Sequence, residues 1–173
     1  MRDIPRAYLT TLQEKGEILR ESRGVYTAPD AISDEMFALQ SRYRGGIFSH
    51  ETALYLHDLS DRSPLVYSVT VPSGYNASTL KKYGAKVYYV KRELHRLGLT
   101  TIASSHGNEI RMYNLERTVC DILRSRKKVD IQLVNEALKR YVKRSDKQLN
   151  VLYQYAEQLN IQRIVREYIE ILL

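Results

Sequence analysis

Apolar residues recur at helical spacing through the last third of the chain. Asn114 precedes the first apolar stripe and can accept hydrogen bonds from the free N–H groups of a first helical turn, where Glu116 complements the helix dipole. Spacings of three and four predict four helices on the stripes Leu115, Val119, Ile122 and Leu123; Ile131, Val134, Leu138, Tyr141 and Val142; Leu149, Leu152, Tyr153, Ala156 and Leu159; and Ile161, Ile164, Val165, Tyr168, Ile169 and Leu172. The pattern predicts a C-terminal helical bundle over residues 114–173. Its last stripe is the best candidate for a homodimer contact, through 161–172, because little sequence remains to cover it.

Strand-like patterns fill the middle of the chain. Alternation of apolar and polar residues predicts strands over 65–71, 87–92, 99–104 and 109–113, of which the last two form a hairpin. We expect a small, mostly antiparallel sheet within residues 65–113. Two short helices precede it, one over 33–43 and one that begins after Ser49, a plausible cap residue.

The N-terminal 30 residues read as a helix followed by a hairpin. Apolar positions between Ile4 and Lys15 predict the helix, and runs at 17–21 and 24–28 predict two short strands around Ser22-Arg23. A helix followed at once by a basic hairpin is typical of the end of a winged helix-turn-helix domain. A complete domain of this kind needs two more helices before these elements, so we expect a truncated winged helix at 1–30 and an α+β domain at 31–173.

Composition places the chain among ordinary globular proteins. Hydrophobic residues make up 43% of the 173 positions, and the sequence contains neither a membrane-spanning run nor an apolar leader. These features lead us to expect a cytoplasmic protein. The single cysteine, Cys120, lies on an apolar helix face, which favours a packed thiol over a nucleophile.

The net charge of +7 is unevenly distributed. Residues 1–30 carry five basic and five acidic side chains, so the whole excess lies later in the chain, in clusters at 81–96, 124–128 and 139–147. Any one of these clusters can be read as a solvated helix or strand face. Three in one small protein favour a nucleic-acid partner.

No pattern typical of an enzyme or metal site stands out. His50 and His57 are seven positions apart, or about 10 Å along a helix, so they cannot share one metal ion. Glu116 and Asp121 point in different directions on one helix and do not converge on a metal or a proton; Asp121 more readily pairs with Arg117 or Arg124. We therefore expect no cofactor, no metal and no catalysis, although carboxylates distant in sequence can still assemble a nucleotide-processing site.

Three segments together resemble a known family. They are Arg23-Gly24-Val25-Tyr26, Ile47-Phe48-Ser49-His50-Glu51-Thr52-Ala53-Leu54 and Glu116-Arg117-Thr118-Val119-Cys120-Asp121-Ile122-Leu123. Their order and spacing are similar to those of the AbiEi antitoxins of abortive-infection, type IV toxin–antitoxin systems, over nearly the whole chain. The resemblance implies a DNA-binding autorepressor of a phage-defence operon. It also implies that the antitoxin neutralises a genetically linked toxin without needing to bind it.

Double-stranded DNA from the chain's own promoter is thus the expected partner. Groups near the bases would come from the first helix, namely Arg6, Tyr8, Thr10 and Thr11. Phosphate contacts would come from the hairpin and the second domain, through Arg20, Arg23, Lys81, Lys82, Lys86, Lys91 and Arg92. In the third motif Glu116, Arg117 and Asp121 are expected to be structural. Two other interpretations stay open: an interaction module that uses the C-terminal helices, and a nucleotide-processing enzyme.

Overall fold

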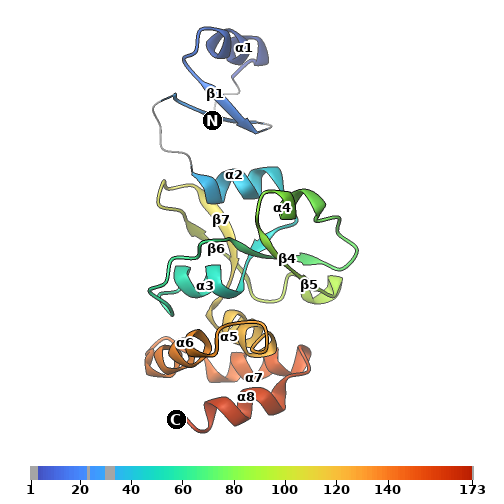
Figure 1. The fold of residues 1–173 in the computed structure, drawn as a ribbon, viewed down its shortest axis with the longest axis vertical. Coiled ribbons are helices and arrows are strands. Elements are labelled where there is room, and N and C mark those ends of the chain that lie inside the picture. Colours follow the sequence, from blue (N-terminus) through green and yellow to red (C-terminus); the bar gives the residue numbers. More distant parts are fainter. Residues whose placement is uncertain (1–3, 23, 30–33, 173) are drawn as a thin grey trace. The chain divides into compact units, whose positions relative to one another are not determined.

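The protein has a mixed α+β fold, as the sequence predicts. The computed structural model describes residues 4–22, 24–29 and 34–172, which form eight α-helices, one 3₁₀ helix and seven strands (Figure 1). The chain divides into two compact units, residues 1–44 with 102–110 and residues 45–101 with 111–173. The predicted boundary at residue 30 lies inside the first of these units.

The first unit begins with the predicted helix and hairpin. Helix α1 spans Arg6–Glu14, and strands β1 (Leu19–Ser22) and β2 (Val25–Thr27) pair antiparallel, with Arg20 opposite Tyr26. No residue of α1 is buried. The helix therefore contributes an exposed surface rather than a core.

Helix α2, Glu35–Arg42, completes the first unit. The side chain of Asp34 caps it by accepting a hydrogen bond from the Phe37 N–H at 3.0 Å. The same carboxylate accepts bonds from Ser104 and Asn108, in the turn between strands β6 and β7. Asp34 therefore joins segments of the chain that lie about 70 positions apart.

A five-stranded sheet runs in the order β5-β4-β3-β7-β6. The strands are β3 (Ile47–Phe48), β4 (Ser68–Pro72), β5 (Lys86–Val90), β6 (Leu99–Ala103) and β7 (Glu109–Tyr113). Strand β3 pairs antiparallel with β4 but parallel with β7, and β4 pairs parallel with β5. The sheet is mixed, so the expectation of a mostly antiparallel sheet is wrong.

The physical cause of this error is the short central strand. With two residues, Ile47 and Phe48, β3 cannot show alternation, yet it separates β4 from β7. Helix α4, Ser78–Lys82, then provides the crossover that parallel pairing of β4 and β5 requires. The expected strand over 65–71 also began too early, since Leu65 is fully exposed and β4 starts at Ser68.

The four C-terminal helices confirm the predicted bundle (Figure 1). They are α5 (Leu115–Arg124), α6 (Ile131–Lys143), α7 (Leu149–Gln158) and α8 (Gln162–Ile169). Every residue of α5 from Leu115 to Leu123 is buried, including Cys120, which is packed as expected. Within the described residues, no helix is long and apolar enough to cross a membrane.

The last helix is largely covered by the chain itself. Ile161, Val165 and Ile169 of the stripe are buried in the core that α8 shares with α5, α6 and α7. Ile164 and Tyr168 are only partly buried. Half of the apolar stripe is thus core, and the homodimer contact through 161–172 stays a prediction.

Gly98 lies where the chain passes closest to α5. Its φ of +72° belongs to the left-handed region, and a Cβ atom there would lie 2.6 Å from the Cβ of Arg117. Its carbonyl accepts a hydrogen bond from the Asn114 N–H at 2.7 Å. Only glycine satisfies both the conformation and the close approach.

We predict that Gly98→Ala destabilises the protein far more than Gly84→Ala. Gly84 has a similar φ of +80°, but no other described atom would lie within 4 Å of an added Cβ. Gly84→Ala should cost about 1–2 kcal/mol from the left-handed conformation alone. Gly98→Ala should cost about 3–5 kcal/mol because overpacking against Arg117 is added.

Urea unfolding of both variants measures the difference. Equal decreases in the free energy of unfolding would show that the approach of Gly98 to α5 is not tight in solution.

Candidate nucleic-acid interface

The N-terminal helix presents its predicted base-contacting residues on two faces. Arg6 and Thr10 are four positions apart on one face of α1, whereas Tyr8 and Thr11 lie on another. The Thr10 hydroxyl donates to the Arg6 carbonyl, and the Thr11 hydroxyl to the Ala7 carbonyl, both at 3.1 Å. The four residues are exposed, but they cannot all face one groove at the same time.

The hairpin presents one of its two predicted phosphate contacts. Arg20 is exposed on β1. Arg23 lies outside the described residues.

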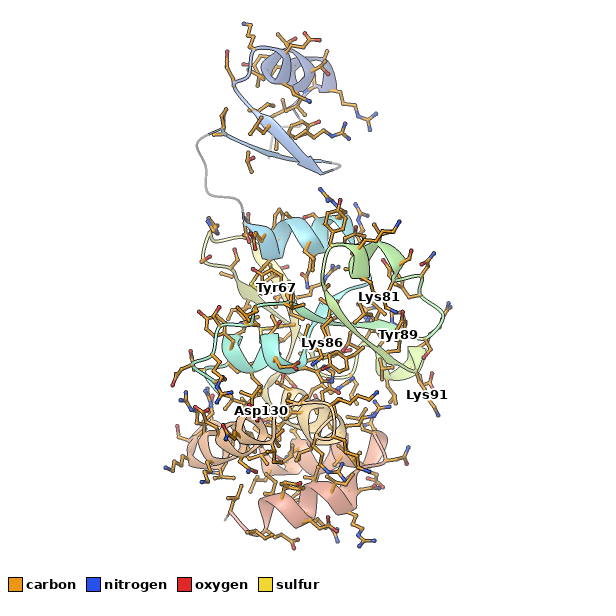
Figure 2. All side chains as sticks on the ribbon, viewed as in Figure 1. Tyr67, Lys81, Lys86, Tyr89, Lys91 and Asp130 are labelled. Atoms are coloured by element: carbon orange, nitrogen blue, oxygen red, sulfur yellow. The ribbon has the colours of Figure 1, made fainter. Side chains whose placement is uncertain are left out.

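The second unit gathers basic side chains on and around strand β5. Lys81 and Lys82 end helix α4, Lys86 begins β5, and Lys91 and Arg92 follow it (Figure 2). All five are exposed, and we call them the β5 basic face. Because β5 is at the edge of the sheet, lysines there also protect the edge from pairing with another chain.

The five side chains of the β5 basic face differ in the contacts that they make with other groups. Lys86 pairs with Glu51 of helix α3 (His50–Leu56) at 2.5 Å. Burial lowers the pKa of Lys86, but the bond to Glu51 outweighs it and the net pKa is raised. Arg92 Nε donates to the Ser73 carbonyl at 3.4 Å, and Lys81 Nζ lies 5.7 Å from the Tyr89 ring centre. Among the described residues, only Lys86 of the five forms an ion pair.

The third motif is buried in the core of the second unit. Glu116 accepts a hydrogen bond from the Gln148 N–H at 3.0 Å and so holds the start of α7. Arg117 pairs with Asp121 at 3.1 Å, which is one of the two pairings that the sequence allows. The Glu116 bond links α5 to α7, whereas the Arg117–Asp121 pair lies within α5.

His50 is more deeply engaged than the sequence indicates. It is buried with a φ of +48°, and its ring stacks on Tyr88 with 3.4 Å between ring centres. Its Nδ1 lies 3.0 Å from the Ser49 hydroxyl, and its Nε2 lies 3.0 Å from the Ser125 hydroxyl. The dense spacing of Ser49, His50 and Glu51 was the only sequence signal for this network.

Ser49 does not cap helix α3 as expected. Its side chain makes no capping hydrogen bond and instead accepts one from the Thr70 hydroxyl at 2.8 Å. Thr70 belongs to strand β4, so the bond fixes the start of α3 against the sheet. The left-handed conformation of His50 accompanies this arrangement.

The ionisable groups around His50 are mostly cationic. Burial lowers the pKa of His50 well below its usual value, and Arg117, Lys86 and Arg124 lower it further. Burial raises the pKa of Tyr88 to about 12. Burial also raises the pKa of Asp121, against the opposing effect of Arg117. His50 is therefore a neutral imidazole at pH 7.

Neither a metal centre nor a known relative accounts for this arrangement. Within the described part of the chain, no three His, Cys, Asp or Glu side chains gather closely enough to hold a metal ion. No protein-family model matches the chain, and no curated protein is significantly similar to it.

We predict that His50→Asn flattens the decrease of stability in acid. Below pH 6.5 the unfolded chain binds a proton at His50 that the folded chain does not, so the unfolding free energy falls as pH falls. One such group contributes at most about 1.4 kcal/mol per pH unit. Asparagine tolerates the left-handed conformation, so the variant should keep the local backbone.

Urea unfolding of the variant between pH 7 and pH 5 measures this slope. His57 and His95, whose pKa values burial also lowers, contribute to the wild-type slope of unfolding free energy against pH. His106→Asn, at an exposed turn residue, is the matched control for replacing a histidine with asparagine, and the slopes of the two variants are compared directly. An undiminished slope in His50→Asn would contradict the prediction.

Proposed function

We propose that this chain binds double-stranded DNA and represses the promoter of its own operon. The observation that carries the proposal is the β5 basic face, where four of five cations have no ion-pair partner among the described residues. Unpaired cations on one surface release counterions when they meet phosphates, which favours binding to DNA. Exposed Arg6 and Tyr8 on α1 and Arg20 on β1 add polar and cationic groups in the first unit.

The helix and hairpin of the first unit are compatible with the end of a winged helix. Helix α1 precedes an antiparallel pair of strands, the order in which a recognition helix precedes a wing. In this proposal α1 offers either its Arg6 face or its Tyr8 face to the bases, and the β5 basic face supplies the salt-dependent part of the affinity.

The proposed biological role is that of an antitoxin in a type IV toxin–antitoxin system. It rests on the resemblance of three motifs to the AbiEi antitoxins. Two of these motifs meet in the fold, because His50 of the second motif lines the same cavity as Arg117 and Asp121 of the third. In this role the cognate toxin is a genetic partner rather than a required binding partner.

An interaction module based on the C-terminal helices is less well supported. Ile161, Val165 and Ile169, on which that interpretation depends, are already buried within the chain. The dependence of binding affinity on salt concentration distinguishes the two functions, since DNA binding weakens steeply with ionic strength and association through apolar burial does not.

We predict that Lys81→Gln/Lys82→Gln weakens DNA binding to any sequence and flattens its salt dependence. The slope of log K against log salt concentration should fall by about 0.9 for each lysine that no longer neutralises a phosphate. Both lysines are exposed at the end of α4, so folding should be unaffected. Fluorescence anisotropy with upstream DNA and with scrambled DNA over a salt series measures the effect.

Lys139→Gln/Lys143→Gln on helix α6 is the control for position, because it makes the same change in net charge at exposed sites of the 139–147 cluster. If this control flattened the slope and the Lys81/Lys82 variant did not, the proposed face would be wrong. If the unaltered chain bound neither DNA, the repressor function would be rejected.

A further inference from the structure

A cavity of about 600 Å³ lies in the second unit between strand β5 and the end of helix α5. Its size is within the range of small-molecule sites. Its lining includes His50, Tyr88, Tyr89, Arg117, Asp121 and Arg124. None of the five residues of the β5 basic face lines it, although Lys86 and Lys81 lie 5.4 and 5.7 Å from the ring centres of Tyr88 and Tyr89 in its lining.

The buried ion pair that lines the cavity is incompletely hydrogen-bonded. Arg117 Nε donates to Asp121 Oδ1, and Arg117 Nη1 donates to the carbonyls of Leu94 and Leu97 at 2.9 and 2.8 Å. The remaining atoms, Arg117 Nη2 and Asp121 Oδ2, are buried without a partner among the described residues. The two side chains are 0% and 4% exposed, and an unsatisfied buried group is destabilising, more so when it is charged.

The two unsatisfied atoms require opposite partners. Nη2 of Arg117 is a donor and Oδ2 of Asp121 is an acceptor, and both atoms are closed to solvent, so they make the wall of the cavity polar but are not open to a ligand.

The mouth of the cavity is strongly cationic. Arg124, Arg126, Lys127 and Lys128 line it, and none of them has an ion-pair partner within the described ranges. They lie at the C-terminal end of α5, whose dipole corresponds to about half a negative charge. Four cations exceed that charge several-fold, which leaves a site for an anionic group.

Aromatic rings form another part of the lining. Tyr88 and Tyr89 are consecutive on β5, and the Tyr88 ring is held in place by its stack on His50 and by its bond to Glu51 at 3.3 Å. Ring faces of this kind stack on nucleobases of any sequence. Figure 2 shows Tyr89 on the strand that carries Lys86.

We propose that this cavity binds a nucleoside phosphate. The Tyr88 ring packs against the base, and Arg124 with Lys127 and Lys128 holds the phosphate. Inorganic phosphate meets only the cations, and a nucleoside meets only Tyr88. The proposal concerns binding and does not depend on DNA repression.

Isothermal titration calorimetry of the full chain with AMP, GMP, CMP and UMP tests the proposal. We expect at least one monophosphate to bind with a Kd below about 1 mM, and at least about tenfold more tightly than its nucleoside or inorganic phosphate. A 5′-phosphorylated trinucleotide tests whether a strand end is the source of the same chemistry. Absence of binding by all four monophosphates, or equal binding by inorganic phosphate, would overturn the proposal.

Arg124→Gln assigns the binding to this cavity. The residue is exposed, so the variant should fold, and its Kd should rise about tenfold because a charge-assisted hydrogen bond to the phosphate is removed. Arg163→Gln is the matched control, because Arg163 lies on helix α8 with a side chain 91% exposed, and its Kd should be unchanged. Equal Kd values in both variants would place the binding elsewhere and overturn the proposal. Because Arg124 lies outside the β5 basic face, the DNA titrations succeed or fail independently of this result.

Discussion

The second unit depends on one buried cation, the guanidinium of Arg117. It is fully buried in α5, where it pairs with Asp121, donates to the Leu94 and Leu97 carbonyls and lies 4.1 Å from the Tyr113 ring centre. A buried charge is tolerated only when it is paired and hydrogen-bonded, and removal of one partner typically costs about 3–5 kcal/mol. The groups that satisfy Arg117 come from the segment after β5, from the end of β7 and from α5. Their positions are therefore fixed together.

The burial of Arg117 explains the residues found at three neighbouring positions. Gly98 is required because the segment that delivers the Leu94 and Leu97 carbonyls must pass against the side chains of Asn114 and Arg117 at the start of α5. The Tyr113 hydroxyl donates to the His95 carbonyl at 2.8 Å, which holds the same segment from the other side. Asn114 then caps α5 by accepting from the Arg117 N–H at 3.0 Å. The motif at 116–123 is thus a folding element, and its residues Arg117 and Asp121 also line the cavity.

Periodicity predicts elements that are long and misses positions that tertiary contacts decide. The four C-terminal helices and the hairpin at 99–113 span enough residues to reveal their period in the sequence. Asn114 can be predicted as the cap of α5 from its residue type and its place before an apolar stripe. Strand β3 has two residues, so it shows no period, and its parallel pairing with β7 cannot be predicted from the pattern. Ser49 is of a residue type that caps helices, but its hydroxyl instead accepts a hydrogen bond from Thr70, on a strand distant in the sequence. The cavity joins residues 50, 88, 117 and 125, which no spacing brings together.

Strand β5 carries residues of both proposed sites. Residues alternate in direction along a strand, so Lys86 and Tyr88 face helix α3, where both contact Glu51, whereas Tyr89 meets Lys81 of α4. Lys86 is thereby committed to an internal ion pair, and the free cations of the β5 basic face lie at Lys81, Lys82 and Lys91 instead. The cations of the cavity come from a different segment, the turn after α5. Because the charges that serve the two surfaces belong to different elements, a substitution of Arg124 changes the cavity without removing a cation of the β5 basic face, and the two functions can be tested with separate variants of the same chain.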